Sequence, residues 1–214
     1  MHKKIFLKLS FISLVLIGNS FPQQNIMLKP DFSDSTKLTQ WKFDGSGSWK
    51  IEDGKLILYC AGIPSGSIRK PSSIAIFKSK PFEKVTIESE IKSTAADSII
   101  RRDIDIIVGY ESPTRFYYVH LAGVSDDVHN GIFLVDNADR RRIDSGKSLP
   151  QLKDGKWHIV RVIRDGKSGK IEVYFDNSKK PVLEAKNTTI SSGQVGVGSF
   201  DDTGEFGNIS ITGN

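Results

Sequence analysis

From about Met27 onward, hydrophobic and polar residues alternate in short runs, and no stretch keeps the period of a helix. Gly, Asn, Asp and Pro interrupt these runs at intervals of about ten residues, which is typical of strands joined by tight turns. Without crossover helices the sheets are expected to be antiparallel, which predicts an all-β jelly-roll sandwich, with a closed barrel as the alternative. Eleven runs predict strands: Ser48–Glu52, Lys55–Tyr59, Ser73–Phe77, Lys84–Ser93, Ile99–Tyr110, Phe116–Leu121, Gly131–Val135, His158–Arg164, Lys170–Phe175, Gly193–Phe200 and Phe206–Thr212.

Two of these strands combine aromatic, acidic and basic residues. Successive side chains of a strand point to opposite faces, so Phe116, Tyr118 and His120 lie together, away from Tyr117 and Val119. Such a face is too polar for a packed core and too aromatic for plain solvent. Sugars bind to surfaces of this kind, because their C–H faces stack on aromatic rings while their hydroxyls form hydrogen bonds. In the preceding strand, alternation places Arg102, Ile104, Ile106, Val108 and Tyr110 on one face, and Arg101, Asp103, Asp105 and Ile107 on the other.

The surroundings of His120 form the candidate site. A histidine beside a tyrosine can transfer protons near neutral pH, so His120 and Tyr118 are the candidate catalytic residues. The alternative is a half-buried strand histidine that only hydrogen-bonds a neighbour. The loop Ser125–Gly131 can fold back over this strand, and an arginine can neutralise a uronate or keto oxygen. The candidate substrate-binding residues are therefore Arg102, Asp103, Asp105, His129 and Asn130.

Residues 1–20 have the layout of a secretory signal peptide. Lysines precede an apolar stretch, residues 11–17, that is too short to span a bilayer. Gly18 and Ser20 then supply the small residues that a signal peptidase requires for cleavage after Ser20. We therefore expect a mature domain of residues 21–214, exported to the periplasm or to the outside of the cell. The alternative is a buried N-terminal helix.

Charge and cysteine content exclude several classes of protein. The formal net charge of +5 falls to +2 once the three lysines of residues 1–20 are removed, so the mature chain lacks the basic excess of a nucleic-acid or membrane-surface protein. The run Arg140–Arg142 predicts a solvated turn, with an anion site as the alternative. The lone cysteine, Cys60, excludes an internal disulfide and a cysteine-rich zinc module.

The segment WHIVRVIRDGKSGKIEVYFD (Trp157–Asp176) resembles the Trp-His strand, turn and Tyr-x-Asp strand of laminin-G-like domains, which belong to the concanavalin A-like lectin/glucanase superfamily. Trp49–Leu56 and Gly193–Ile211 resemble the first and last strands of the same jelly roll. The resemblance covers nearly the whole mature chain. It is closest to secreted bacterial members that act on carbohydrates, such as the 3-keto-disaccharide hydrolase-like group.

The resemblance carries two structural expectations. It implies a two-sheet jelly roll in which the indole of Trp157 is buried between the sheets. It also implies a structural calcium ion on the convex side, bound by Asp202 together with backbone groups of Asp31 or Gly45.

The resemblance leaves the activity open. The Glu-x-Asp-x-x-Glu strand of the glucanases is absent, and the nearest pair of acids, Asp103 and Asp105, is ~7 Å apart along one strand. That spacing by itself is compatible with an inverting glycosidase. We expect an exported protein that binds a poly- or oligosaccharide on the concave face of one sheet and that, if it is an enzyme, cleaves it as a hydrolase or lyase. The alternative is a non-catalytic adhesion or protein-interaction module of the laminin-G type.

Overall fold

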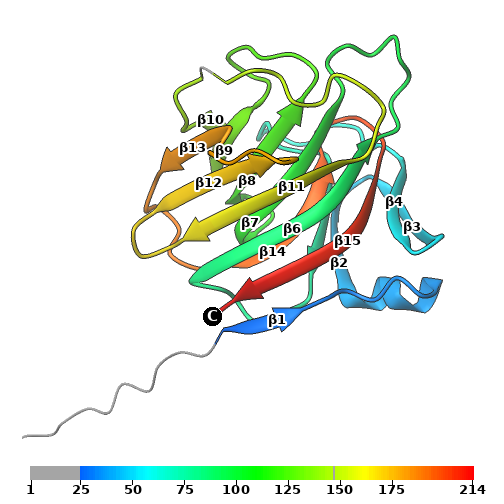
Figure 1. The fold of residues 1–214 in the computed structure, drawn as a ribbon, viewed down its shortest axis with the longest axis horizontal. Helices are drawn as coiled ribbons and strands as arrows, with labels where there is room; N and C mark the ends of the chain where they lie inside the picture. Colours follow the sequence, from blue (N-terminus) through cyan, green and yellow to red (C-terminus); the bar gives the residue numbers. More distant parts are fainter. Residues whose placement is uncertain (1–24, 147) are drawn as a thin grey trace, which may run out of the picture.

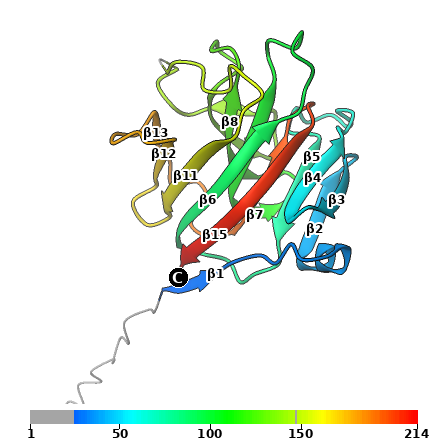
Figure 2. The same cartoon turned by 45° about the vertical axis from the view of Figure 1, so that its right-hand side comes forward.

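A computed structural model describes residues 25–146 and 148–214, so the expected signal peptide, residues 1–20, lies outside the described residues. The described chain forms two antiparallel sheets that pack face to face (Figures 1 and 2). The two separate sheets confirm the predicted all-β sandwich and exclude the barrel. Within the same residues, no helix is both long and apolar enough to cross a membrane.

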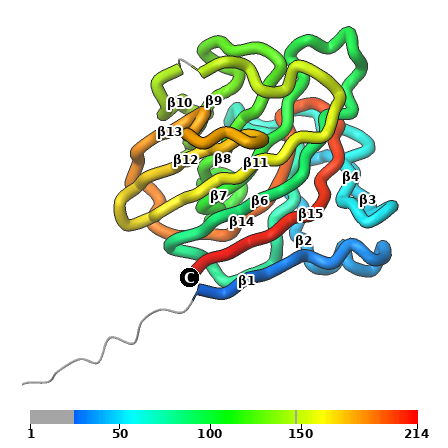
Figure 3. Tube along the Cα trace, viewed as in Figure 1, coloured from blue at the N-terminus to red at the C-terminus, as the bar shows by residue number. Residues whose placement is uncertain are grey.

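The first sheet has eight strands, and β1 joins it by pairing with β15 at one end of the molecule (Figure 3). In order across the sheet the other strands are β13 (Leu183–Lys186), β12 (Lys170–Phe175), β11 (His158–Asp165), β6 (Lys84–Ser93), β15 (Gly204–Gly213), β4 (Lys55–Cys60) and β3 (Ser48–Glu52), and β1 is Ile26–Leu28.

The second sheet has seven strands, and a 3-10 helix, η1 (Ser35–Gln40), leads into its edge strand β2. Across the sheet the order is β10 (Arg141–Arg142), β9 (Gly131–Asp136), β8 (Arg115–Ala122), β7 (Asp103–Ser112), β14 (Gln194–Ser199), β5 (Ser73–Phe77) and β2 (Trp41–Gly45).

All eleven sequence-predicted strands are present, four with the predicted bounds and seven with shifted ends. The largest shift is at β7, which begins at Asp103 because residues 96–102 form turns in which the Ile99 amide donates to the Ala96 carbonyl and the Arg102 amide donates to the Ile99 carbonyl. The sequence pattern missed β1, β2, β10 and β13. Three of these four have only two to four residues, too few for alternation to show.

The main hydrophobic core lies between the sheets and follows from strict alternation. Ile87 and Ile91 of β6 point toward Ile104 and Ile106 of β7 in one buried cluster. A second buried cluster covers the opposite, outer face of the seven-stranded sheet. Its members all come from that sheet, apart from Ile68 in a loop: Ile74, Ile76, Ile107, Tyr110, Phe116, Tyr118, Phe133 and Val135. This outer face is therefore packed over much of its area, although the sequence pattern indicated a face too polar for a packed core.

Trp157 is not buried between the sheets, so that prediction is wrong. Its side chain is 39% exposed, and the ammonium groups of Lys55 and Lys92 lie 5.5 and 5.9 Å from its ring centroid. The reason is the period of β11. Val160 and Val162 point into the core, which turns the odd-numbered positions, including 157, to the outer surface.

Tyr110 lies on the outer face of the seven-stranded sheet, opposite to the side that alternation predicted. Between Val108 and Ser112 the register of β7 against β8 shifts, which marks a bulge. Gly109 has a φ of +63° at this point, in the left-handed region that suits glycine. Against β14 the bulge adds one residue to β7, since Gly196 faces Ile107 but Gln194 faces Tyr110, and this extra residue turns Tyr110 to the outer face.

Candidate functional site

A cavity of about 500 Å³ opens on the outer face of the seven-stranded sheet, where β7 begins and β8 and β14 end. We call it the His120 cavity. Its floor is buried and its rim is exposed, so it is open to solvent on one side only. The lining residues are Arg69, Ile99, Arg101, Asp103, His120, Val128, His129, Arg140, Phe200, Asp201 and Asp202.

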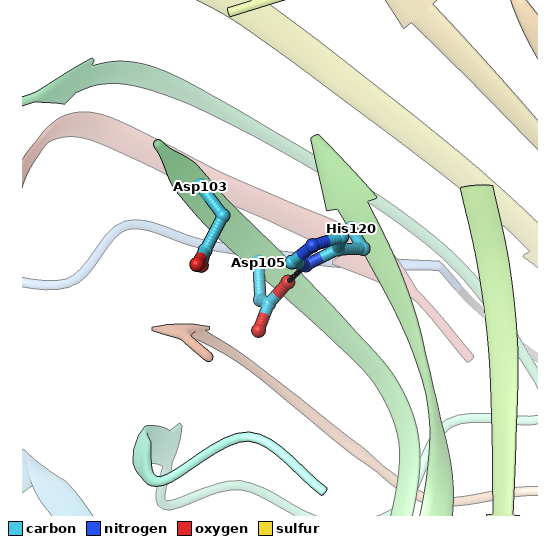
Figure 4. Close-up of side chains that lie close together, drawn as sticks. All are labelled: Asp103, Asp105 and His120. Carbon is cyan, nitrogen blue, oxygen red and sulfur yellow. Dashed lines mark hydrogen bonds and ion pairs between the residues drawn. The ribbon is translucent and has the colours of Figure 1, made fainter. Parts of the chain in front are cut away.

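Strand pairing explains how the floor is built. Asp105 of β7 lies directly opposite His120 of β8, and its other neighbour across the sheet is Gly198 of β14. Asp103 lies two residues away on the same face of β7. The predicted sharing of one face by Asp103 and Asp105, and of another by Tyr118 and His120, is therefore correct, and pairing places these two faces side by side (Figure 4).

His120 and Asp105 form a buried polar pair. The imidazole is 1% exposed, and its Nδ1 shares a hydrogen bond of 2.8 Å with Asp105 Oδ1 (Figure 4). Neither His120 Nε2 nor Asp105 Oδ2 has a hydrogen-bond partner. Burial lowers the pKa of His120 to about 4, and burial raises the pKa of Asp105 well above its usual value. Both shifts favour the uncharged forms, so the ring is a neutral imidazole at pH 7.

Asp103 joins the start of β7 to the turn that follows β14. Its Oδ1 accepts hydrogen bonds from the Ser199 hydroxyl at 2.8 Å and from the Phe200 amide at 2.7 Å. Its own amide donates to Asp202 Oδ2 at 3.0 Å. Burial raises the pKa of Asp103 to about 8, with the nearby Asp105 carboxylate adding to the rise. Burial and the charge of Asp201 also raise the pKa of Asp202.

An arginine and an aromatic ring form one wall of the cavity. The guanidinium carbon of Arg140 lies 4.2 Å from the Phe200 ring centroid, and that of Arg69 lies 5.7 Å from it on a neighbouring segment. Arg140 Nη1 donates to the Tyr118 hydroxyl at 2.9 Å. Tyr118 is fully buried and is not among the lining residues. Its phenol therefore supports Arg140 and does not face the cavity.

The loop before β9 brings one of its two expected residues into the cavity. His129 lines the wall, with its ring centroid 5.8 Å from that of His120 and its Nδ1 2.8 Å from Asp126 Oδ1. Asn130 is fully buried, with a φ of +51°, and its Nδ2 donates to the Leu149 carbonyl at 2.7 Å. The structure thus places Asn130 outside the lining, where it fixes the loop that carries His129.

Arg102 is also placed away from the cavity. Its Nε donates to the Ile99 carbonyl at 3.2 Å and its Nη2 lies 3.3 Å from Asp97, so it holds the loop before β7 together. The preceding residue, Arg101, lines the cavity instead. Sequence reasoning missed Arg69, Phe200 and Asp201, which come from loops, and took Arg140 first as a turn residue. The sequence indicated Arg140 in one way only, through the alternative prediction that the run Arg140–Arg142 forms an anion site.

Of the residues of the implied calcium site, Asp31 and Asp202 line different hollows. Asp31 lines a different hollow, of about 640 Å³ beside β1, and its carboxylate lies 3.2 Å from Lys37 Nζ. That hollow is larger than the His120 cavity, but it has no histidine and only two acidic residues on its wall. Gly45 lies beside the Ser72 carbonyl in the edge strand β2.

Two other groups of acidic and histidine side chains are close enough to hold a metal ion. One is Asp103, Asp105 and His120, and the other is Asp103, Asp201 and Asp202; within each group the ligand atoms lie within 4.8 Å of one another. Both groups belong to the His120 cavity or its floor.

No protein-family model matches the chain. No curated protein matches it either. Solved structures share its fold at low sequence identity. The carbohydrate-binding module CBM66 from Bacillus subtilis is 16% identical over 80% of this chain and 94% of that one, with a TM-score of 0.61. Basic winged bean lectin, solved with the Tn-antigen, is 14% identical over 89% and 99% of the two chains, with a TM-score of 0.58.

Lectin I from Ulex europaeus, solved with the methyl glycoside of alpha-L-fucose, is 12% identical over 89% of this chain and 98% of that one, with a TM-score of 0.56. At these identities the likeness concerns the fold. It confirms the concanavalin A-like jelly roll that the sequence resemblance implied.

Proposed function

We propose that the protein binds carbohydrate in the His120 cavity. The observation that carries the proposal is a buried floor with unpartnered polar atoms beneath an aromatic wall. His120 Nε2 and Asp105 Oδ2 lack partners, and the Phe200 ring stands beside them. Buried polar atoms are costly to leave unpaired, and sugar hydroxyls supply both donors and acceptors. The C–H face of a pyranose ring suits an aromatic wall.

The composition of the rim supports a sugar over a purely apolar ligand. Ile99 and Val128 supply exposed apolar contacts, whereas Arg69, Arg101 and Asp201 supply charged hydrogen-bonding groups. Concave sites with a few convergent polar groups are typical of small-molecule binding. Two of the three similar structures reported above are lectins, and the third is named a carbohydrate-binding module.

A glycan screen tests the proposal. The purified exported protein is applied to poly- and oligosaccharides, and the binding found is compared with that of His120→Gln and Asp201→Asn. We expect both variants to lose affinity. Asp127→Asn is the matched control, because Asp127 is exposed in the same loop as His129 but is not a lining residue. Wild-type protein that binds no glycan, or binding that survives both cavity variants, would contradict the proposal and favour the adhesion-module alternative.

Glycan cleavage is a second candidate function, and the His120–Asp105 pair favours it. A neutral imidazole with a free Nε2, held by a carboxyl group on Nδ1, has the form of an oriented general base. Asp103, whose pKa is raised to about 8, is the matching proton donor on the same floor. Product detection in the same screen, followed by a pH–rate profile, tests this role. A bound glycan that remains intact over long incubation would limit the protein to binding.

Export forms part of the proposal. It rests on the basic, apolar and small-residue order of residues 1–20. An exported protein meets polysaccharides in the periplasm or outside the cell, where the His120 cavity would act on them.

A further inference from the structure

Arginine side chains supply the positive charge of the His120 cavity, whose lining includes Arg69, Arg101 and Arg140. In the part of the chain that the structure describes, no ion pair joins any of these three to an acidic side chain. Arg115 and Arg142, by contrast, pair with carboxylates at 2.6 and 2.7 Å. The charge on the cavity wall is therefore available to a ligand.

Two of these arginines are held next to each other by the backbone. The Arg140 amide donates to the Arg69 carbonyl at 2.9 Å, and the Arg69 amide donates to Asp139 Oδ1 at 2.7 Å. The guanidinium carbons of Arg140 and Arg69 lie 4.2 and 5.7 Å from the centroid of the same ring, Phe200. Two positive charges held this close repel each other, and a bound anion would offset the repulsion.

Both arginines retain hydrogen-bond donors for such an anion. Arg140 Nη1 donates to the Tyr118 hydroxyl, but Arg140 Nε is buried and has no hydrogen-bond partner. A buried N–H group without an acceptor destabilises the protein unless a ligand supplies one. Arg69 is exposed at the rim, and its recorded hydrogen bonds within the described residues involve its backbone groups. A guanidinium presents its N–H groups as a planar fork that matches two oxygens of a carboxylate or a sulfate.

The acidic side chains of the cavity do not cancel this positive charge at neutral pH. Burial raises the pKa of Asp103 to about 8 and raises the pKa of Asp105 well above its usual value, so both carboxyl groups are mostly protonated at pH 7. The negative charge of the lining then comes from Asp201 and Asp202, against three arginines. A cavity of this composition suits a ligand that has both an anionic group and hydroxyls.

A second hollow adjoins the His120 cavity at these arginines. It has a volume of about 410 Å³ and is lined by residues 64–69 and Asp139. It shares Arg69, Phe200 and Asp201 with the His120 cavity, so these residues lie where the two spaces meet. A ligand that occupies both spaces is longer than one sugar ring.

We propose that the His120 cavity and the second hollow together bind an acidic oligosaccharide, with its carboxylate or sulfate group held by Arg69 and Arg140 beside Phe200. The inference rests on the proposed carbohydrate function and names the class of glycan. Hydroxyls of the same ligand reach Asp201 and the unpartnered His120 Nε2.

Pairs of glycans that differ only in charge test the proposal. Oligosaccharides of pectate and alginate are compared with their carboxyl-reduced forms, and carrageenan fragments with their desulfated forms, by calorimetry on the exported protein. We expect the acidic member of at least one pair to bind about tenfold or more tightly than its neutral partner, and to bind less tightly as salt is added. The two kinds of pair distinguish a carboxylate from a sulfate. The acidic oligosaccharide should also bind more tightly than its monosaccharide.

Variants locate the anion. Arg69→Gln and Arg140→Gln should each lower the affinity for the acidic glycan by about tenfold and leave the affinity for its neutral partner nearly unchanged. The Arg69 side chain is exposed and its backbone hydrogen bonds remain in the variant, so Arg69→Gln folds even where a change at Arg140 does not. Arg141→Gln is the matched control, because Arg141 is exposed beside Arg140 but does not line the cavity. It should keep the preference for the acidic glycan.

The inference and the proposed function fail on different results. Acidic and neutral members bound equally well by the wild type would overturn the inference and leave the carbohydrate function standing. A preference for acidic glycans that survives both Arg69→Gln and Arg140→Gln, or equal affinity for an acidic monosaccharide and its oligosaccharide, would do the same. A wild-type protein that binds neither acidic nor neutral glycans would remove the proposed function and the inference with it.

Discussion

Asp105 on β7 and His120 on β8 face each other across an antiparallel pair and share a hydrogen bond of 2.8 Å, although both side chains are almost completely buried. A carboxyl and an imidazole at facing positions are what the pleat produces when each strand turns its polar residues to the same side. The pair forms the floor of the His120 cavity, and each partner keeps one unpaired atom. The floor is thus held by strand pairing, but two of its buried polar atoms, His120 Nε2 and Asp105 Oδ2, lack hydrogen-bond partners.

Stability should fall as the pH rises from about 6.5 to about 8. The pKa of Asp103 is raised to about 8 by burial, so the folded protein keeps a proton that the unfolded chain has already released, and this contribution is lost as pH rises toward 8. Burial lowers the pKa of His120 to about 4, which has the opposite sign but acts only between about pH 4 and the ordinary pKa of 6.5.

Above pH 6.5 the contribution of His120 no longer changes with pH, so nothing from His120 opposes the contribution of Asp103. The buried Asp105, whose pKa is also raised, adds to the Asp103 contribution with the same sign. We expect the free energy of unfolding to decline by roughly 1–3 kcal/mol per pH unit there, because each of the two groups contributes up to about 1.4 kcal/mol. The decline should be shallower in Asp103→Asn and unchanged in Asp127→Asn. Denaturant melts at pH 6.5, 7.25 and 8 measure it, and a wild-type stability that is flat or rising over this range would contradict the assignment.

Trp157→Ala should change the free energy of unfolding by less than about 1 kcal/mol, because the indole is exposed and contacts two lysines. Trp41, which is 3% exposed in the core, is the matched comparison. Trp41→Ala should cost about 3–5 kcal/mol. Circular dichroism during urea unfolding gives both values without relying on tryptophan emission. Equal losses would mean that β11 is misplaced by one residue.

Gly109→Ala should destabilise the fold by about 1–2 kcal/mol or more. Its φ of +63° is unfavourable for alanine, and an added Cβ would lie 3.2 Å from Arg164 Nε and 3.3 Å from the Tyr117 ring. Gly54 is a useful control, since its φ is +70° but nothing lies within 4 Å of an added Cβ. Thermal melts should therefore give Gly109→Ala a lower Tm than Gly54→Ala. The reverse order would contradict the bulge at Gly109 as the reason that Tyr110 lies on the outer face.

Tyr118→Phe should weaken glycan binding by less than about tenfold and leave any acid–base limb of a pH–rate profile unchanged. The Tyr118 side chain does not line the cavity, and its hydroxyl holds Arg140 in place by accepting a hydrogen bond from the guanidinium. Tyr117→Phe is the adjacent control. Its hydroxyl contacts Asn187 and the Ile190 amide on the other face of β8, so its loss should cost stability and spare binding. A loss of turnover in Tyr118→Phe as large as that in His120→Gln would restore a catalytic role to the phenol.

Export should leave a mature N-terminus at Phe21. Cleavage after Ser20 removes the basic and apolar residues that precede it. N-terminal sequencing of protein recovered from the periplasm or the medium measures this directly. Recovery of exported protein that still begins with Met1 would show that residues 1–20 are not a cleaved signal.

Alternation along the chain was enough to predict eleven of the fifteen strands in the described residues and the floor of the site, because these depend on a period of two residues that sequence displays directly. It could not predict Arg69 or Phe200, since loop residues have no period and reach the cavity only through the tertiary fold. It also failed where local geometry interrupts the period. The bulge at Gly109 reverses Tyr110, and the turn before Asp103 removes Arg102 from the face assigned to it. The resemblance predicted a buried Trp157, whereas the alternation that points Val160 and Val162 into the core turns position 157 to the outer surface.

The floor and the rim of the His120 cavity are attached to different kinds of structure. Asp103, Asp105 and His120 are fixed by paired central strands, whereas Arg69, Val128 and Asp201 stand on three separate loops. Substitutions on those loops can change which ligand fits without disturbing the hydrogen bonds of the floor. In the proposed carbohydrate site, ligand selectivity can therefore diverge through the loops while the hydrogen-bonded pair of the floor is inherited unchanged.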